Sequence, residues 1–192
     1  RQRRFTVHAQ RILHLTGDML QRFHLVLVEL QRAHGGLVSL HQAGSGKASR
    51  DAGGREAYEP LFRSSMESIL ARAEQLGIQV AFEAISRIDS DAYCSLSETA
   101  EFIRSFRSPA LRLQVDSIHL HTNGETDFYQ GLLKVDISDV DRMAPDGRHF
   151  DFPLLIQALK ETGFQDYLVF EFRANPPADA AKAGLDYIRA LL

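Results

Sequence analysis

The chain has 192 residues, of which 44% are hydrophobic and 24% charged, and its formal net charge is −3. This composition predicts one globular domain over residues 1–192 and excludes a disordered chain. The weak negative charge argues against nucleic acid as a partner. The apolar stretch FHLVLVEL is too short to span a membrane, and the single cysteine, Cys94, favours a reducing, cytoplasmic compartment.

In chain order, helical periodicity dominates the segment 1–36, and a short buried strand is expected at 37–41. A Gly- and Ser-rich loop follows, and then a long amphipathic helix from Glu56 that ends at Gly77. Further strands are predicted at 78–83, 111–116, 132–137 and 167–172, and helices at 95–106, 125–132, 151–160 and 178–191. Five strands that alternate with helices indicate an α/β fold with a parallel sheet and crossover helices.

Four of the five predicted strands carry a carboxylate at or near their last residue. These acids are Glu83, Asp116, Asp136 and Glu171. Because all parallel strands end at the same face, the four side chains are expected to converge. Clustered carboxylates repel one another, and a divalent cation is a simple way to stabilise them.

The alternative is that each acid pairs separately with a basic side chain. The candidates nearest in sequence are Arg87, Arg112, Lys134 and Arg173. For a single acid this alternative is favoured, whereas four acids at equivalent places favour the metal.

The segments VAFEAISRID, LQVDSIH, LKVDISDVDRMAPDGRHFDF and LVFEF resemble, in this order, the second half of xylose isomerase-like barrels, the sugar-phosphate isomerase/epimerase superfamily. The resemblance covers about residues 37–191. In that family a Glu, an Asp, a His and a second Glu hold one divalent metal, which implies Glu83, Asp116 and Glu171 as metal ligands here. Asp136 stands where the family has the histidine, and an oxygen ligand there favours Mn or Mg over Zn.

The resemblance also implies the chemistry. A metal-dependent sugar or sugar-phosphate isomerase or epimerase moves a proton through an enediolate, and the family's two metal-binding glutamates match Glu83 and Glu171 as general base and acid. The implied substrate-binding residues are His119, Arg142 and Asp89. No role is implied for His121, which is expected on the surface.

The Gly-rich segment GSGKAS resembles a phosphate-binding loop, but the complete motif fails because position 41 is a histidine. Lys47 is nevertheless a candidate for contact with a substrate phosphate. His41, at the end of its strand, is an ambiguous ligand candidate.

Two other functions remain open from the sequence. An endonuclease IV-like phosphodiesterase uses the same barrel, but it needs more histidines at strand ends than this chain offers. A metal-free barrel that binds a sugar or a protein partner without catalysis is favoured by the change from His to Asp at Asp136.

Five strands do not close an eight-stranded barrel, and the chain begins with Arg1 rather than Met. We therefore expect an N-terminally truncated, TIM-barrel-like sheet of about five strands, preceded by a helical segment at 1–36. An uncovered sheet edge exposes unpaired backbone groups, so a homodimer is also expected.

Overall fold

The computed structural model describes residues 6–8, 37–41, 53–126, 132–173 and 177–192. Contacts divide the chain into two compact units, which we call unit 1 (Arg1–Leu113) and unit 2 (Gln114–Leu192). Strand β4 (Leu111–Asp116) has residues in both units. None of the helices in the described part of the chain has both the length and the apolar character that a membrane span requires.

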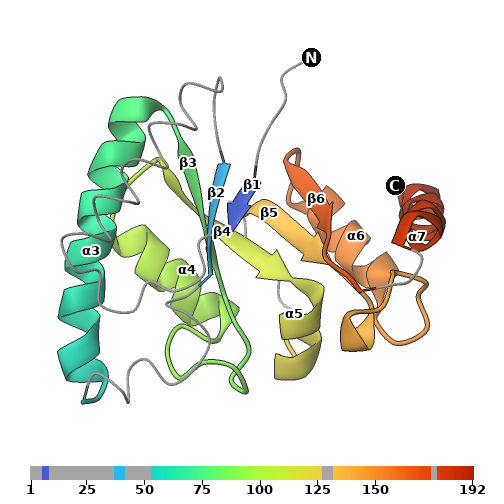
Figure 1. The fold of residues 1–192 in the computed structure, drawn as a ribbon, viewed down its shortest axis with the longest axis horizontal. Helices are drawn as coiled ribbons and strands as arrows, with labels where there is room; N and C mark the ends of the chain where they lie inside the picture. The colour runs from blue at the N-terminus through green and yellow to red at the C-terminus, as the bar shows by residue number, and fades with distance from the viewer. Residues whose placement is uncertain (1–5, 9–36, 42–52, 127–131, 174–176) are drawn as a thin grey trace. The chain divides into compact units, whose positions relative to one another are not determined.

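In its described residues, unit 1 has parallel strands with two helices beside them (Figure 1). Its strands follow the order β1 (Thr6–His8), β2 (Leu37–His41), β3 (Gln79–Glu83) and β4, and its helices are α3 (Arg55–Leu76) and α4 (Leu96–Ser105). The backbone of Val38 lies opposite Val80, and that of His41 lies opposite Glu83. The carboxyl ends of β2 and β3 therefore reach the same edge of the sheet.

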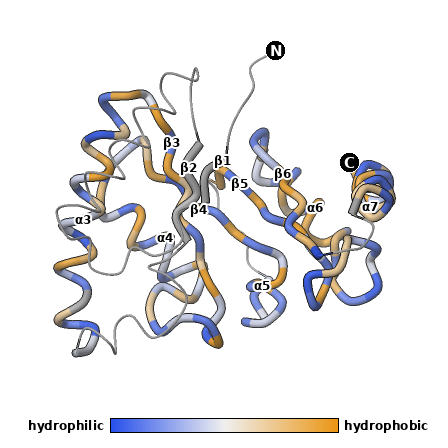
Figure 2. Tube along the Cα trace, in the orientation of Figure 1, coloured by the Kyte–Doolittle hydropathy of each residue, from blue (hydrophilic) through white to orange (hydrophobic). Residues whose placement is uncertain are grey.

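The core of unit 1 lies between α3, α4 and β3. Phe62, Met66, Ile69 and Ala73 recur at helical spacing along α3 and are buried against Phe82 of β3. Between these positions α3 carries polar residues, and Figure 2 shows hydrophobic and hydrophilic positions alternating along it. The predicted amphipathic helix is therefore present, and it buries one face.

Three predicted helix ends are confirmed by their caps. Gly77 ends α3 in the left-handed conformation, with φ +65°. The Ser95 side chain accepts a hydrogen bond from the backbone N–H of Glu98 at 3.2 Å, and the Asp151 carboxylate accepts one from the N–H of Leu154 at 3.0 Å. These caps start α4 and α6 where the sequence places them.

Unit 2 continues the strand–helix alternation. Its strands follow the order β4, β5 (Leu132–Ile137) and β6 (Tyr167–Phe170), and its helices are α5 (Ser117–Asn123), the 3₁₀ turn η1 (Val140–Arg142), α6 (Phe152–Glu161) and α7 (Pro177–Leu191). β5 and β6 pair in parallel, with Asp136 opposite Val169. Every residue of β5 is buried, whereas the four residues of β6 are half-buried.

The fold class predicted from the sequence is confirmed, but the strand count differs. Residues 6–8 form β1, although a helical segment is predicted over 1–36. Thr6 and Val7 are β-branched, and the segment pairs with β2. The described part of the chain therefore has six strands where about five are predicted. Residues 9–36 lie outside the described residues, and the single-domain organisation over 1–192 stays a prediction.

Two further elements of unit 2 differ from the prediction. α5 is a helix that the sequence pattern does not predict, because its residues SIHLHTN lack an apolar stripe; it begins at the cap residue Asp116 and ends at Gly124. The predicted helix at 125–132 is wrong at its ends, because 125–126 are not helical and Leu132 begins β5. Its middle, 127–131, lies outside the described residues.

Candidate active site at the ends of β4, β5 and β6

Polar side chains fill one face of β4 and β5 in unit 2. Alternate residues of a strand point to the same side, so Gln114 and Asp116 share a face of β4, and Lys134 and Asp136 share a face of β5. All four residues are fully buried. Buried charged groups are costly unless they are paired, so the partners of these side chains define the electrostatics of the site.

Asp116 has two sets of contacts at the end of β4. One carboxylate oxygen, Oδ1, accepts a hydrogen bond from the backbone N–H of Ile118 at 3.1 Å and caps α5. The other oxygen, Oδ2, forms an ion pair with Arg142 Nη1 at 2.5 Å. A charge-assisted contact to a buried carboxylate is among the stronger polar interactions in proteins.

Arg142 also approaches Glu171, which follows β6. Its Nη1 atom lies 3.5 Å from Glu171 Oε2, and the two side chains are 26% and 39% exposed. The guanidinium therefore lies between two of the predicted ligand carboxylates, and both Arg142 and Glu171 remain accessible to a small molecule.

The turn that carries Arg142 is held in place by Asp139. The Asp139 carboxylate accepts hydrogen bonds from the backbone N–H groups of Val140 at 2.8 Å and Phe150 at 3.1 Å. Asp141 and Arg142 both have positive φ, at 61° and 60°, a conformation that is uncommon outside glycine. Asp139 therefore secures a strained turn that presents Arg142 to the site.

Asp139 is also an ionised group in a buried place. Burial raises the pKa of its carboxyl, but hydrogen bonds from the Val140 backbone and from Asp146 and His149 outweigh this effect, and the pKa is lowered from its ordinary value of 3.8. No role for Asp139 is predicted from the sequence, although it begins the Asp-x-x-Arg run that ends at Arg142. Gln114 is the second site residue that is not predicted from the sequence. The feature that could have identified it is a single amide on an apolar strand, two residues before Asp116.

Lys134 and Gln114 both donate hydrogen bonds to Asp136. Lys134 Nζ and Gln114 Nε2 each lie 2.7 Å from its Oδ2 atom, and all three residues are buried. For Asp136 and Asp116 the structure thus shows a basic partner, which is the alternative that the sequence leaves open. Lys134 is one of the partners considered from the sequence, and Arg142 is not.

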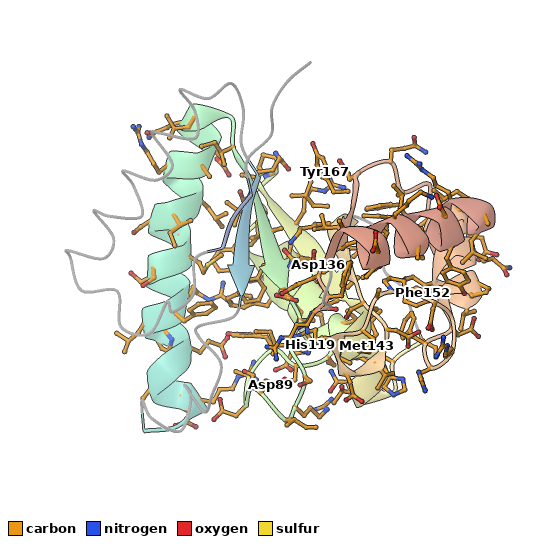
Figure 3. The ribbon with its side chains drawn as sticks, turned by 45° about the vertical axis from the view of Figure 1, so that its right-hand side comes forward. Asp89, His119, Asp136, Met143, Phe152 and Tyr167 are labelled. Atoms are coloured by element: carbon orange, nitrogen blue, oxygen red, sulfur yellow. The ribbon has the colours of Figure 1, made fainter. Side chains whose placement is uncertain are left out.

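Asp116 is better placed than Asp136 to be a metal ligand. Within unit 2, Asp116 and His119 belong to a group of candidate ligands whose atoms lie within 4.8 Å of one another. Asp136 is not a member of that group in the described part of the chain. His119, labelled with Asp136 in Figure 3, lies in the first turn of α5 and is half-buried. A carboxylate and an imidazole suit a divalent metal.

Two predicted site residues of unit 1 lie at or after the end of β3. Glu83 is the last residue of β3 and is buried. Asp89 lies in the loop after β3, is exposed, and accepts a hydrogen bond from the Ser86 hydroxyl at 2.5 Å. Lys47 lies outside the described residues, so its predicted role stays a prediction.

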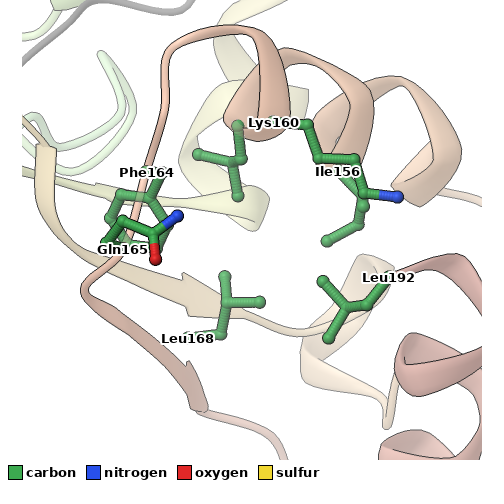
Figure 4. A pocket seen from close by; sticks show the side chains of 7 residues that line it. Ile156, Lys160, Phe164, Gln165, Leu168 and Leu192 are labelled. Atoms are coloured by element: carbon green, nitrogen blue, oxygen red, sulfur yellow. The ribbon is translucent and has the colours of Figure 1, made fainter.

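A separate pocket of about 190 Å³ lies between α6, β6 and the carboxyl terminus of the chain (Figure 4). It is lined by Ile156, Leu159, Lys160, Phe164, Gln165, Leu168 and Leu192. None of these is a predicted site residue, and most are apolar. The pocket's basic side chain, Lys160, donates a hydrogen bond to the carbonyl oxygen of Leu191.

The fold is similar to that of several solved structures. 3-Keto-D-glucoside 4-epimerase from E. coli matches with a TM-score of 0.77 and 19% identity, over 97% of this chain and 78% of that chain. D-psicose 3-epimerase from Clostridium cellulolyticum H10, solved with D-tagatose, matches with a TM-score of 0.75 and 15% identity, over 92% and 71%. The IolI protein, solved with a zinc atom, matches with a TM-score of 0.69 and 14% identity, over 98% and 76%.

At these identities the solved structures support the fold alone. The family assignment comes from the sequence itself, because the family model for xylose isomerase-like TIM barrels matches residues 17–191. This match spans nearly the whole chain and includes every predicted site residue. The chain therefore belongs to the xylose isomerase-like TIM barrel family.

Proposed function

We propose that the protein is a metal-dependent isomerase or epimerase that acts on a sugar or a sugar phosphate. The observation that carries this proposal is the group at the end of β4, where candidate ligand atoms of Asp116 and His119 lie within 4.8 Å of each other, while Arg142 pairs with Asp116 and lies 3.5 Å from Glu171. The solved relatives that are named as sugar epimerases support this substrate class.

Asp116 and His119 are the residues of unit 2 that would hold a divalent metal. Glu83 and Glu171 are proposed as further ligands on the basis of their sequence positions at strand ends. When bound, the ion would act as a Lewis acid toward the carbonyl and hydroxyl oxygens of the sugar. A ligand set dominated by carboxylates favours Mn or Mg, although the IolI relative was solved with zinc.

The chain's own groups perform the proton transfer in this proposal. Glu171 is partly exposed at the end of β6, so its carboxylate can take a proton from a carbon next to the carbonyl and return it. Glu83 is proposed as the second proton-transfer group, from its place at the end of β3. Both are carboxylates, so each can act as the base in one direction and as the acid in the other.

Arg142 and His119 are proposed to bind the substrate's oxygens. The Arg142 guanidinium carries a fixed positive charge and is accessible, so it can stabilise the negative charge of an enediolate oxygen. His119 can serve either as a metal ligand or as a hydrogen-bond donor to the substrate. Asp89 and Lys47 are proposed substrate contacts from the sequence, Lys47 toward a phosphate.

The test is exchange of deuterium from solvent into a panel of ketoses and aldoses, with Mn supplied. Glu171→Gln should reduce exchange by roughly 10²–10⁴-fold, because a general acid–base group contributes about that much. The matched control is Glu161→Gln, the same change at an exposed carboxylate on α6, which should leave exchange unaltered. Wild-type protein that exchanges deuterium into no sugar would rule out the isomerase function.

A second candidate is a metal-free barrel that binds a sugar without catalysis. It is favoured by the two ion pairs of unit 2, Arg142 with Asp116 and Lys134 with Asp136, because these cations already compensate two carboxylates. Metal analysis separates the candidates. Purified protein that stays empty in excess Mn, yet binds a sugar in calorimetry, would support this second function.

We also propose a homodimer. β6 is the last strand in the order of unit 2, it pairs with β5, and its residues are only half-buried. An uncovered strand edge is a site for association. Light scattering tests this: a monomer mass at high protein concentration would contradict the proposal.

A further inference from the structure

Lys134 is a lysine in a place where lysines are rare. Its side chain is fully buried, in the middle of β5, where every residue is buried. An ammonium group in such a place needs an anion, because its desolvation is otherwise not compensated. Asp136, two residues later on the same face of β5, supplies that anion at 2.7 Å.

The arrangement has a third member, Gln114, on the neighbouring strand β4. Its Nε2 atom donates to the same Asp136 oxygen at 2.7 Å, and its side chain is also fully buried. One oxygen of Asp136 therefore receives an ammonium and an amide donor at the same time. We call Lys134 and Asp136 the buried charge pair, and Gln114 is the amide that donates to it.

A metal ligand and a lysine counter-ion are competing roles for one carboxylate. A divalent cation on Asp136 would stand beside the Lys134 ammonium, and the two positive charges would repel each other in a place with little water. Asp116 differs, because its cation comes from Arg142, which is partly exposed and can turn toward solvent or substrate. Lys134 has no such route, since its side chain is fully buried.

We infer that Asp136 is the counter-ion of Lys134 and contributes no ligand to the metal. This inference rests on the proposed function, since it concerns the same metal site. The buried charge pair is neutral as a whole and supports the end of β4, where Asp116 follows Gln114 by two residues. The metal then has one protein ligand fewer than the four strand-end acids suggest, which leaves one more coordination position for water or substrate oxygens.

The experiment is a double-mutant cycle with two readouts, the Tm in EDTA and the Kd for Mn. The variants are Lys134→Met, Asp136→Asn and the double variant, in which the asparagine oxygen still accepts from Gln114. Each single variant leaves one buried charge without its partner and should lower the Tm by roughly 6–20 °C. The double variant should recover most of either loss, because it leaves neither charge behind.

The Mn readout separates a counter-ion from a ligand. The double variant should bind Mn within about threefold of the wild type, whereas the control Asp116→Asn should weaken binding by at least about tenfold. If the double variant loses Mn as Asp116→Asn does, Asp136 is a ligand and the inference is wrong. Equally, if the Tm losses of the single variants simply add in the double variant, the pair does not exist. Wild-type protein that takes up no Mn refutes the metal-dependent function, and the Tm cycle then decides the pairing by itself.

Discussion

Replacing Arg142 by methionine tests the geometry of the site without any ligand. The substitution keeps the length of the apolar stem but leaves the fully buried Asp116 carboxylate without the guanidinium that lies 2.5 Å away. The bond from Ile118 to the other carboxylate oxygen remains, so α5 keeps its cap. The variant therefore removes the guanidinium contacts with Asp116 and Glu171 and leaves the cap of α5 in place.

The magnitude follows from burial. A hydrogen bond to a charged group contributes about 1.5–3 kcal/mol, and for a chain of this size each kcal/mol shifts the Tm by roughly 2–4 °C. Arg142→Met should therefore lower the Tm by about 3–12 °C. The loss should persist in 1 M NaCl, because salt screens a pair with a buried partner only weakly.

The matched control is Arg148→Met, the same change in the same loop. Arg148 Nε lies 2.9 Å from Asp146 Oδ2, but these side chains are 77% and 44% exposed. An exposed pair is worth only about 0.2–1 kcal/mol, and salt reduces it further. Both variants are unfolded by heat in EDTA, so that no added metal replaces the lost cation, and followed by circular dichroism. Equal losses in the two variants, or a loss at Arg142 that vanishes in high salt, would refute the reasoning.

Asp139→Asn should lower the free energy of unfolding at pH 7, measured in urea. The difference from the wild type should shrink as the pH falls below 3.8, because the lowered pKa of Asp139 stabilises the fold only while the carboxylate is ionised. A difference that does not depend on pH would contradict this. Tyr93→Phe should change the free energy of unfolding by less than about 1 kcal/mol or raise it, since the buried Tyr93 hydroxyl has no hydrogen-bond partner among the described residues; a large loss in chemical denaturation would reveal a partner. Gly147→Ala should cost about 1–3 kcal/mol more than the control Gly163→Ala, because both glycines have positive φ but only a Cβ at Gly147 would overlap the Tyr187 hydroxyl; equal thermal shifts would show that Tyr187 moves aside freely.

Most of the fold follows from local sequence signals. The strand–helix alternation is visible in apolar periodicity, and the ends of α3, α4 and α6 are set by capping residues that act within one turn. β1 was missed because three residues are too few to show a period, and its strand conformation depends on pairing with β2. α5 is not predicted because its residues SIHLHTN lack an apolar stripe, although Asp116 caps its first turn.

The site is predictable where a residue type and a strand end coincide. The sequence pattern predicts Asp116, Arg142 and Glu171 as site residues, and Arg142 contacts both acids in unit 2; their roles in metal binding and catalysis stay predictions. The contacts of Gln114 and Asp139 could not be predicted, because they depend on the neighbouring strand in one case and on a folded turn in the other. In the sequence, each of these two residues is recognisable only as a polar residue in or just after an apolar strand.

The cap at Asp116 has a consequence for how the site responds to a ligand. Asp116 and His119 are three residues apart and are joined through the first turn of α5, so they form a preassembled element whose internal spacing does not depend on distant parts of the chain. Arg142 and Glu171 come from two separate segments, after β5 and after β6, and lie outside that element. Adaptation to substrates of different size should therefore be confined to the loops after β5 and β6, while the Asp116–His119 element serves as a constant reference point.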